Sequence, residues 1–144
     1  MKTGKTRSTP SAPSSRDFNI MRMDHTTLQT NHLEETKNFF CEVLELHSGD
    51  RPPFDFPGYW LYNQMDEHPI IHLIGTEKKI GNDTGALHHL AYLGDPDRYD
   101  EFDTRINDME WAQDRRVVPG SSIRQIFVTG PHNILVELNF PEAT

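Results

Sequence analysis

The sequence predicts an α+β fold that contains two copies of a strand–helix–three-strand (βαβββ) unit. Predicted elements occur twice in the same order, and the two copies start about 65 residues apart. The chain has 144 residues, the size of one domain, and its 35% apolar content suffices for a packed core. A single unit is too small to bury its sheet face, whereas two units together can form one curved, cleft-like mixed sheet.

The first unit begins with a strand in which apolar and polar side chains alternate. A helix follows, because apolar residues recur at helical spacing after Thr30 or Asn31, either of which is a suitable capping residue. Three prolines and two glycines between residues 49 and 58 then predict a loop. The elements expected in this unit are a strand at 20–29, a helix at 32–45, a short strand that ends at Gly49, and strands at 59–64 and 69–75.

The second unit repeats this order after a linker at 75–85. Asp95 is expected to cap its helix, and Pro96 suits the first helical position, where no backbone N–H is needed. The helix carries an apolar stripe that ends near Met109. The elements expected in this unit are strands at 87–93, 116–118, 123–129 and 133–140 and a helix at 95–110.

The chain divides into a short tail and one folded domain. Residues 1–17 are rich in Ser, Thr, Pro and Lys and contain no apolar run, so they are expected to form a disordered tail. The folded domain is expected at 18–144, with module one at about 18–76 and module two at about 86–141.

Composition excludes several classes of function. The net charge is −8, which argues against nucleic acid as the main partner because phosphate binding requires a basic face. No stretch approaches the roughly 20 apolar residues that span a bilayer. The single cysteine, Cys41, excludes an intrachain disulfide and a cysteine-rich zinc module. With no secretory signal pattern near the N-terminus, these features predict a cytoplasmic protein.

Four side chains that commonly bind metals occupy matching places in the two units. In the first unit, His25 and His72 lie in the first and last expected strands. In the second unit, His89 and Glu137 lie in the same two strands, and the two separations differ by one residue. A carboxylate in so apolar a strand needs a partner. A divalent metal held by the histidines would provide one, and so would Arg124 on the neighbouring strand.

Alternation along each strand indicates the face on which each candidate lies. His72 and Glu137 are each expected to share a face with the residues two positions away on either side. His88 precedes His89 and is therefore expected to point the other way. The remaining histidines, expected in loops or at helix ends and in contact with solvent, are His32, His47, His68 and His132.

Four motifs in this order resemble the vicinal oxygen chelate superfamily over about residues 20–141. They are MRMDHTTLQTNHLEETKNFFCEVLEL (21–46), PIIHLIG (69–75), LHHLAY (87–92) and GPHNILVELNF (130–140). This superfamily includes glyoxalase I, fosfomycin-resistance proteins, methylmalonyl-CoA epimerase, bleomycin-resistance proteins and extradiol dioxygenases. The last motif departs from the family ending DP-x-G-N-x-x-E-L at Gly130 and at His132-Asn133.

The resemblance implies a paired βαβββ fold with one divalent metal bound in the cleft. The ligand positions that it carries over to this chain are His25, His72, His89 and Glu137. It also implies a homodimer, because modules from two subunits often complete each site in two-module relatives. The metal stays open among Fe, Mn, Co, Ni and Zn, since three histidines and a carboxylate accept all of them.

The ligand set favours some reactions of the superfamily over others. Extradiol dioxygenases use two histidines and a glutamate, which His25, His89 and Glu137 match, as a triad suited to Fe(II) and O₂. Those enzymes commonly have a tyrosine where this chain has Phe127, and glyoxalase I-like proteins place a glutamate at the position of His72. The expected catalytic residues are His72 and Glu137. Ring-cleaving dioxygenase chemistry is favoured, and a glyoxalase- or epimerase-like lyase or isomerase is the alternative.

Two further interpretations differ in what they require of the site. Fosfomycin-type transferases share three of the ligands but also need a cation-rich pocket, for which Arg51 and Arg124 are the candidates. A metal-free protein of the bleomycin-resistance type would sequester an aromatic ligand and needs no metal ligands, so the complete set here argues against it.

Charge and aromatic content describe the expected substrate. Three neutral imidazoles and one carboxylate leave a divalent metal with a residual charge of about +1, which favours a small anionic molecule with two neighbouring oxygens. Five aromatic residues between 54 and 62 suit either a substrate wall or packing in the core or a dimer interface. The residues expected near the substrate are Phe54, Phe56, Tyr59, Tyr62, Arg124 and Phe127.

Overall fold

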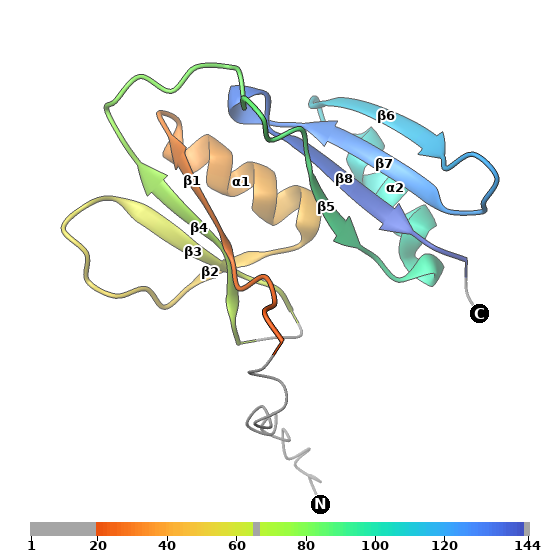
Figure 1. Ribbon diagram of the computed structural model, residues 1–144, viewed down its shortest axis with the longest axis horizontal. Helices are drawn as coiled ribbons and strands as arrows, with labels where there is room; N and C mark the ends of the chain where they lie inside the picture. Colours follow the sequence, from red (N-terminus) through yellow and green to blue (C-terminus); the bar gives the residue numbers. More distant parts are fainter. Residues whose placement is uncertain (1–19, 65–66, 143–144) are drawn as a thin grey trace, which may run out of the picture.

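The structure, a computed structural model, describes residues 20–64 and 67–142. The tail expected at 1–17 lies outside these residues. Within them, eight strands form two four-stranded sheets, one from each half of the chain (Figure 1). The duplicated βαβββ unit that the sequence predicts is therefore present, with its strands divided between two sheets.

The elements of the first module are β1 (Thr26–Thr30), α1 (Leu33–Leu44), β2 (His47–Gly49), β3 (Gly58–Tyr62) and β4 (Pro69–Gly75). β1 runs parallel to β4, β4 pairs antiparallel with β3, and β3 pairs antiparallel with β2. In the ladder between β1 and β4, Thr27 lies opposite His72.

The elements of the second module are β5 (Leu90–Leu93), η2 (Pro96–Arg98), α2 (Tyr99–Asn107), β6 (Ala112–Val117), β7 (Arg124–Thr129), η3 (Pro131–Asn133) and β8 (Leu135–Phe140). The two sheets have the matching strand orders β1-β4-β3-β2 and β5-β8-β7-β6. Ala91 lies opposite Glu137 in the parallel ladder between β5 and β8, which is the position equivalent to Thr27 opposite His72.

Both leading strands start later than the alternating pattern predicts. The strands expected at 20–29 and 87–93 are formed only over β1 and β5. The parallel ladders begin with Thr26 opposite Ile71 and with Leu90 opposite Val136. His25 and His89 consequently lie one residue before a strand rather than inside one.

Different side chains determine the two helix starts. Asp95 accepts a backbone hydrogen bond and caps η2, which leads directly into α2, as expected. The cap expected at Thr30 or Asn31 is wrong, because α1 begins after His32, whose side chain makes no capping bond. Thr30 is instead buried, where its hydroxyl accepts the N–H of His32 and bonds to the hydroxyl of Thr36.

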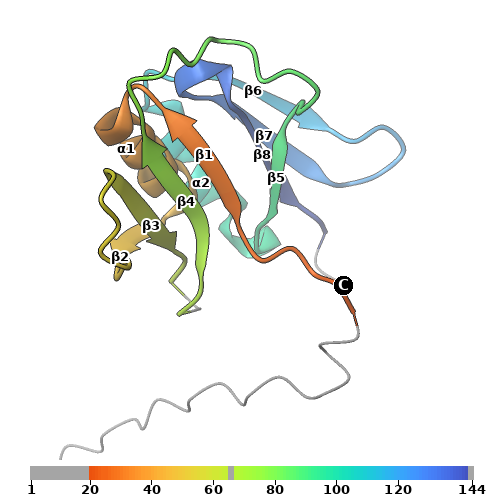
Figure 2. The same ribbon diagram turned by 60° about the vertical axis from the view of Figure 1, so that its left-hand side comes forward.

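One hydrophobic core joins the two modules. Figure 1 shows α1 between the two sheets, and the turned view in Figure 2 shows both helices behind β1 and β4. The ring of Phe39 in α1 contacts Trp111 of the second module, with centroids 5.1 Å apart. Among the described residues, neither helix is long and apolar enough to cross a bilayer. The fully buried large side chains are Phe39, Phe40, Val43, Leu61, Ile71, Leu73, Ile106, Ile126, Val128, Val136 and Phe140.

The central strands β4 and β8 turn alternate residues toward this core. On β4 the buried positions alternate with His72, and on β8 they alternate with Glu137. Both side chains therefore lie on the outer face of their sheet, away from the helices, in agreement with the alternation of the sequence.

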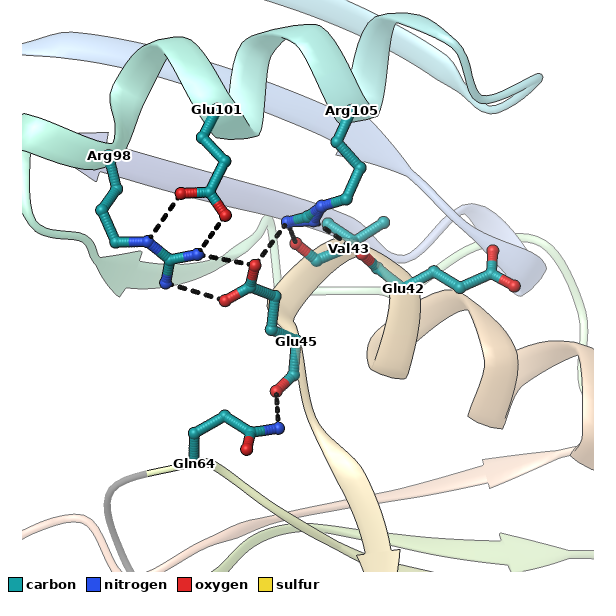
Figure 3. Close-up of polar contacts among 7 residues, drawn as sticks. All are labelled: Glu42, Val43, Glu45, Gln64, Arg98, Glu101 and Arg105. Carbon is teal, nitrogen blue, oxygen red and sulfur yellow. Dashed lines mark hydrogen bonds and ion pairs between the residues drawn. The ribbon is translucent and has the colours of Figure 1, made fainter.

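Charged side chains join the ends of the two helices (Figure 3). Arg98 donates from both terminal nitrogens to the carboxylate of Glu45, at 2.7 and 2.8 Å, and also binds Glu101. Arg105 of α2 donates to two carbonyl oxygens in the last turns of α1, at 3.1 and 3.3 Å. These contacts hold α2 against the C-terminal end of α1.

His132 is buried, which corrects the expectation that it lies in solvent. It has a φ of 57° within η3, and its ring meets both β1 and the linker. The N–H of Asn31 donates to Nε2 at 3.2 Å, so Nδ1 carries the proton and donates to the oxygen of Gly81 at 2.9 Å. The ring therefore ties the linker to the first module.

Candidate metal centre

The first pair of expected ligands meets on the outer face of the first sheet. His25, just before β1, and His72, in β4, stack with ring centroids 3.8 Å apart and planes 13° from parallel. Trp60 in β3 lies opposite His72 in register and stacks against it at 4.2 Å. Contacts with two other rings therefore fix the plane of the His72 ring.

The Nε2 atom of His72 is buried and has no hydrogen-bond partner among the described residues. Burial lowers the pKa of His72, and the neighbouring His25 lowers it further. The ring is consequently neutral at neutral pH. Because a neutral imidazole is the form that binds a divalent metal, this half of the donor set fits such an ion.

Asp24 orients the other histidine of the pair. Its carboxylate bonds to Nδ1 of His25 and lies 3.1 Å from Nε2 of His68. The hydrogen bond with His25 lowers the pKa of Asp24, which keeps the carboxylate ionised. A carboxylate on one ring nitrogen leaves the other, Nε2 of His25, available as a ligand. This role was not predicted, although the adjacent Asp and His were the signal for it.

The second pair meets at the equivalent place on the second sheet. Oε2 of Glu137 lies 3.8 Å from Nε2 of His89. Gln125 and Asn139 each donate an amide N–H to one oxygen of Glu137, at 3.1 and 2.9 Å. Because the Glu137 side chain is only 12% exposed, these amides compensate part of the desolvation of its charge. Neither amide was predicted, although alternation along β7 and β8 places both on the outer face.

Arg124 is not the partner of Glu137, which corrects the alternative raised from the sequence. Its guanidinium lies 3.9 Å from the centroid of the Tyr99 ring in α2 and 4.0 Å from Asp100. Successive residues of a strand face opposite sides. Gln125, the next residue of β7, therefore reaches Glu137 instead.

His88 contacts His89 through its ring. The two Nδ1 atoms are 2.9 Å apart, and the ring planes are 86° from parallel. Since Nδ1 of His89 is engaged in this way, Nε2 is the atom that faces Glu137. His88 is thus placed to orient His89.

The two pairs do not come together within one chain. Among the residues that the structure describes, no group of three or more His, Cys, Asp or Glu side chains lies close enough to hold a metal ion. Each pair lies on the outer face of its own sheet, while the inner faces of both sheets pack on the shared core. The chain therefore presents two separate pairs of candidate ligands, one in each module.

A hollow of about 170 Å³ adjoins His72. Of the residues expected near the substrate, Phe54 and Phe56 line it, and Phe127 lies opposite Glu137 in the ladder between β7 and β8. The residues that line the hollow are Thr27, Arg51, Phe54, Phe56, Trp60, His72, Leu73 and Ile74.

Three of the expected pocket residues lie elsewhere. The hydroxyl of Tyr59 donates to Glu34 of α1, and the hydroxyl of Tyr62 donates to the backbone oxygen of Asp50. Arg124 lines a larger hollow of about 360 Å³ at the C-terminal end of β8. None of the four expected ligands lines that hollow, so the larger of the two hollows is not the one beside the candidate metal ligands.

No family model matches the chain, and no curated protein matches its sequence. Solved structures do match its fold. The fosfomycin resistance protein FosX from Listeria monocytogenes is 18% identical, with a TM-score of 0.62 over 87% of this chain and 94% of that one. A glutamate-to-glutamine mutant of it, complexed with Mn(II) and 1S,2S-dihydroxypropylphosphonic acid, is 20% identical, with a TM-score of 0.64 over 85% and 94%. A glyoxalase/dioxygenase from Nostoc punctiforme is 16% identical, with a TM-score of 0.66 over 94% and 100%.

The protein has the paired βαβββ fold of the vicinal oxygen chelate superfamily, to which these matches belong. The resemblance carried by the four motifs is therefore confirmed at the level of the fold. Within this fold, the two pairs of candidate ligands occupy matching places in the two modules.

Proposed function

We propose that the protein is a divalent-metal-dependent enzyme that acts on a small anionic substrate with two neighbouring oxygens. The observation that carries this proposal is the repeated half-site. Each module pairs a histidine just before its first strand with a ligand-type side chain on its last strand, at the same register. Unrelated surface histidines would not repeat in this way. The Mn(II) complex of the FosX mutant supports a divalent metal on this fold.

The complete centre forms between two copies of the chain, so the protein is a homodimer. Each module supplies two donors on an outward-facing sheet. A symmetric dimer that sets module one of one copy against module two of the other brings four donors together. Two equivalent centres result, each with His25 and His72 from one copy and His89 and Glu137 from the other.

The side chains around the donors prepare them for this role. Asp24 holds Nδ1 of His25, and Gln125 and Asn139 hold the carboxylate of Glu137 in one orientation. His72, neutral and buried at Nε2, either completes the ligand set or accepts a proton from a substrate oxygen. When bound, a divalent metal supplies Lewis acidity toward two neighbouring oxygens.

The aromatic lining beside His72 favours ring-cleaving dioxygenase chemistry on a planar substrate. The alternative is a lyase or isomerase reaction of glyoxalase or epimerase type on a hydroxy-carbonyl substrate. The ligand in the FosX complex is an aliphatic vicinal diol rather than an aromatic ring, which supports a non-aromatic substrate for this alternative.

Metal content tests the proposal directly. Protein purified anaerobically without a His-tag is analysed by mass spectrometry as wild type, Glu137→Gln and His47→Ala. His47, exposed on β2, is the matched histidine control. We expect about one metal ion per chain in the wild type and in the control, and a large loss in Glu137→Gln.

The identity of the metal then directs the search for a substrate. Iron would point to catechols, screened with an oxygen electrode, whereas Mn, Zn, Ni or Co would point to hydroxy-carbonyl compounds. Absence of metal from all three proteins, even after reconstitution, would contradict the proposal and leave a protein that only binds its ligand.

A further inference from the structure

A loop before β3 forms one wall of the hollow beside His72. Arg51 donates from Nη2 to the backbone oxygen of Phe56 at 2.9 Å. Its guanidinium carbon also lies 5.0 Å from the ring centroids of both Phe54 and Phe56. The two rings stack on each other with centroids 5.0 Å apart. The loop is thus ordered by its own contacts, although the two phenylalanines are 45% and 38% exposed.

The charge of Arg51 is not balanced by an acidic partner. The ion pairs formed among residues 20–64 and 67–142 include none with this side chain. By contrast, Arg98, Arg115 and Arg116 each bind a carboxylate at 2.6 to 2.8 Å. One of the five N–H donors of Arg51 is used on Phe56, so the others remain available to an anion in the hollow.

The hollow is small and lined largely by aromatic rings. Its volume of about 170 Å³ is below the roughly 300–1,000 Å³ of a whole small-molecule site, so it accommodates one part of a ligand. Phe54 and Trp60 contribute rings 6.4 Å apart and tilted 52° from each other, and His72 lies nearly parallel to Trp60. An aromatic ring can pack against such walls in a tilted or edge-to-face arrangement.

We propose that this hollow binds an aromatic ring that carries a carboxylate, and that Arg51 recognises the carboxylate. This inference rests on the proposed function, in which two vicinal oxygens of the same ring reach the metal beside His72. The substrate class is then an aromatic vicinal-diol acid rather than a neutral catechol.

A carboxylate matches this lining better than a phosphonate does. A guanidinium and a carboxylate form two parallel hydrogen bonds in one plane. Arg51 is the only arginine or lysine that lines the hollow. It balances a carboxylate, whereas a phosphonate dianion would keep about one unpaired negative charge in a largely aromatic setting.

Calorimetric binding of two catechols to the anaerobic, metal-loaded protein tests the proposal. The probes are 3,4-dihydroxybenzoate and 4-methylcatechol, in which a methyl group replaces the carboxylate. Arg51→Gln should weaken binding of 3,4-dihydroxybenzoate by about 10- to 100-fold and that of 4-methylcatechol by less than about twofold. Arg51→Lys keeps the positive charge but not the planar pair of guanidinium donors. Its affinity for 3,4-dihydroxybenzoate should lie between those of the wild type and Arg51→Gln.

The control is Lys79→Gln, which removes the same charge from an exposed position in the linker and should bind both probes as the wild type does. Equal losses for both probes in both Arg51 variants would mean that the loop has merely collapsed and would overturn the proposal. Unchanged binding of both probes would overturn it as well. Arg51-dependent binding of 1S,2S-dihydroxypropylphosphonate that is tighter than that of 3,4-dihydroxybenzoate would replace the carboxylate with a phosphonate.

Benzoate binding to the metal-free protein separates this inference from the proposed function. Benzoate lacks vicinal oxygens and needs only Arg51 and the aromatic walls. Arg51-dependent benzoate binding in a protein that takes up no metal would support the hollow as a carboxylate site while the proposed function fails. Metal uptake without any preference for the carboxylated probe would support the proposed function and contradict the assignment of the hollow as a carboxylate site. A hollow that binds neither carboxylate, for example because a second copy fills it, would overturn the inference.

Discussion

At the scale of single residues, the carboxylate of Glu137 accepts an amide hydrogen bond on each of its oxygens. Unlike a guanidinium group, amides orient a carboxylate without neutralising its charge. The full negative charge therefore remains for a cation that approaches the outer face of the sheet. Arg124 would have balanced that charge within the chain, but its position over Tyr99 prevents this.

Tyr92 makes stability depend on pH in the alkaline range. Burial raises the pKa of Tyr92 from 10.0 to about 12 in the folded protein. Between these values the unfolded chain releases a proton that the folded protein retains, so unfolding becomes more favourable as the pH rises. The contribution is complete below about pH 10 and falls by up to about 2–3 kcal/mol toward pH 12.

Urea unfolding of the wild type and Tyr92→Phe, compared from about pH 9 to pH 12, measures this contribution. The gap between the two free energies of unfolding should change across this range, because phenylalanine cannot ionise. Curves that stay parallel would contradict the assignment to Tyr92.

At the scale of elements, the C-terminal end of α1 is completed by α2. Glu45, which follows the helix, has a left-handed φ of 56° although it is not glycine. The last turn of α1 contains no basic residue of its own. Arg105 of α2 supplies the donors for its free carbonyl oxygens, and Arg98 holds the side chain of Glu45.

We expect Arg105→Met to destabilise the protein more than Arg98→Met does. Arg98 is 40% exposed, and exposed ion pairs contribute about 0–1 kcal/mol. Arg105 is 28% exposed and satisfies backbone carbonyls, a role that contributes about 1–3 kcal/mol. Urea unfolding of the two variants measures the difference. A larger loss from Arg98→Met would contradict this ranking.

Element packing also explains where the chain departs from the family ending. Gly130 stands where that ending has aspartate, and a Cβ atom here would lie 2.6 Å from the ring of Phe39. The ring of Phe39 belongs to the core that joins the modules and has 0% exposure. A side chain at position 130 would therefore collide with the contact between α1 and the second module.

At the scale of the whole molecule, a centre shared between subunits predicts complementation. His25→Ala and Glu137→Gln each remove one ligand from both centres of a homodimer. In a heterodimer of the two variants, one centre lacks both ligands and the other is intact. Heterodimers selected with two different tags that do not bind metals should therefore hold about half the metal of the wild type, measured by mass spectrometry.

A centre formed within one chain gives a different result. Heterodimers would then hold no more metal than either parent variant, because every centre lacks one ligand. Light scattering that gives a monomer at micromolar concentration would also contradict the shared centre.

The sequence by itself determined the repeated βαβββ units, the outer-face positions of His72 and Glu137 and the matching places of the candidate ligands in the two modules. These follow from strand alternation and from duplication, which are properties of local sequence. Only the tertiary structure decided where β1 and β5 begin, because these strands form by pairing with β4 and β8, which are distant in the chain. It also decided that amides rather than Arg124 hold Glu137, that His132 is buried, and that the two pairs of candidate ligands lie apart among the described residues. These depend on contacts between residues distant in the chain, which local patterns do not encode.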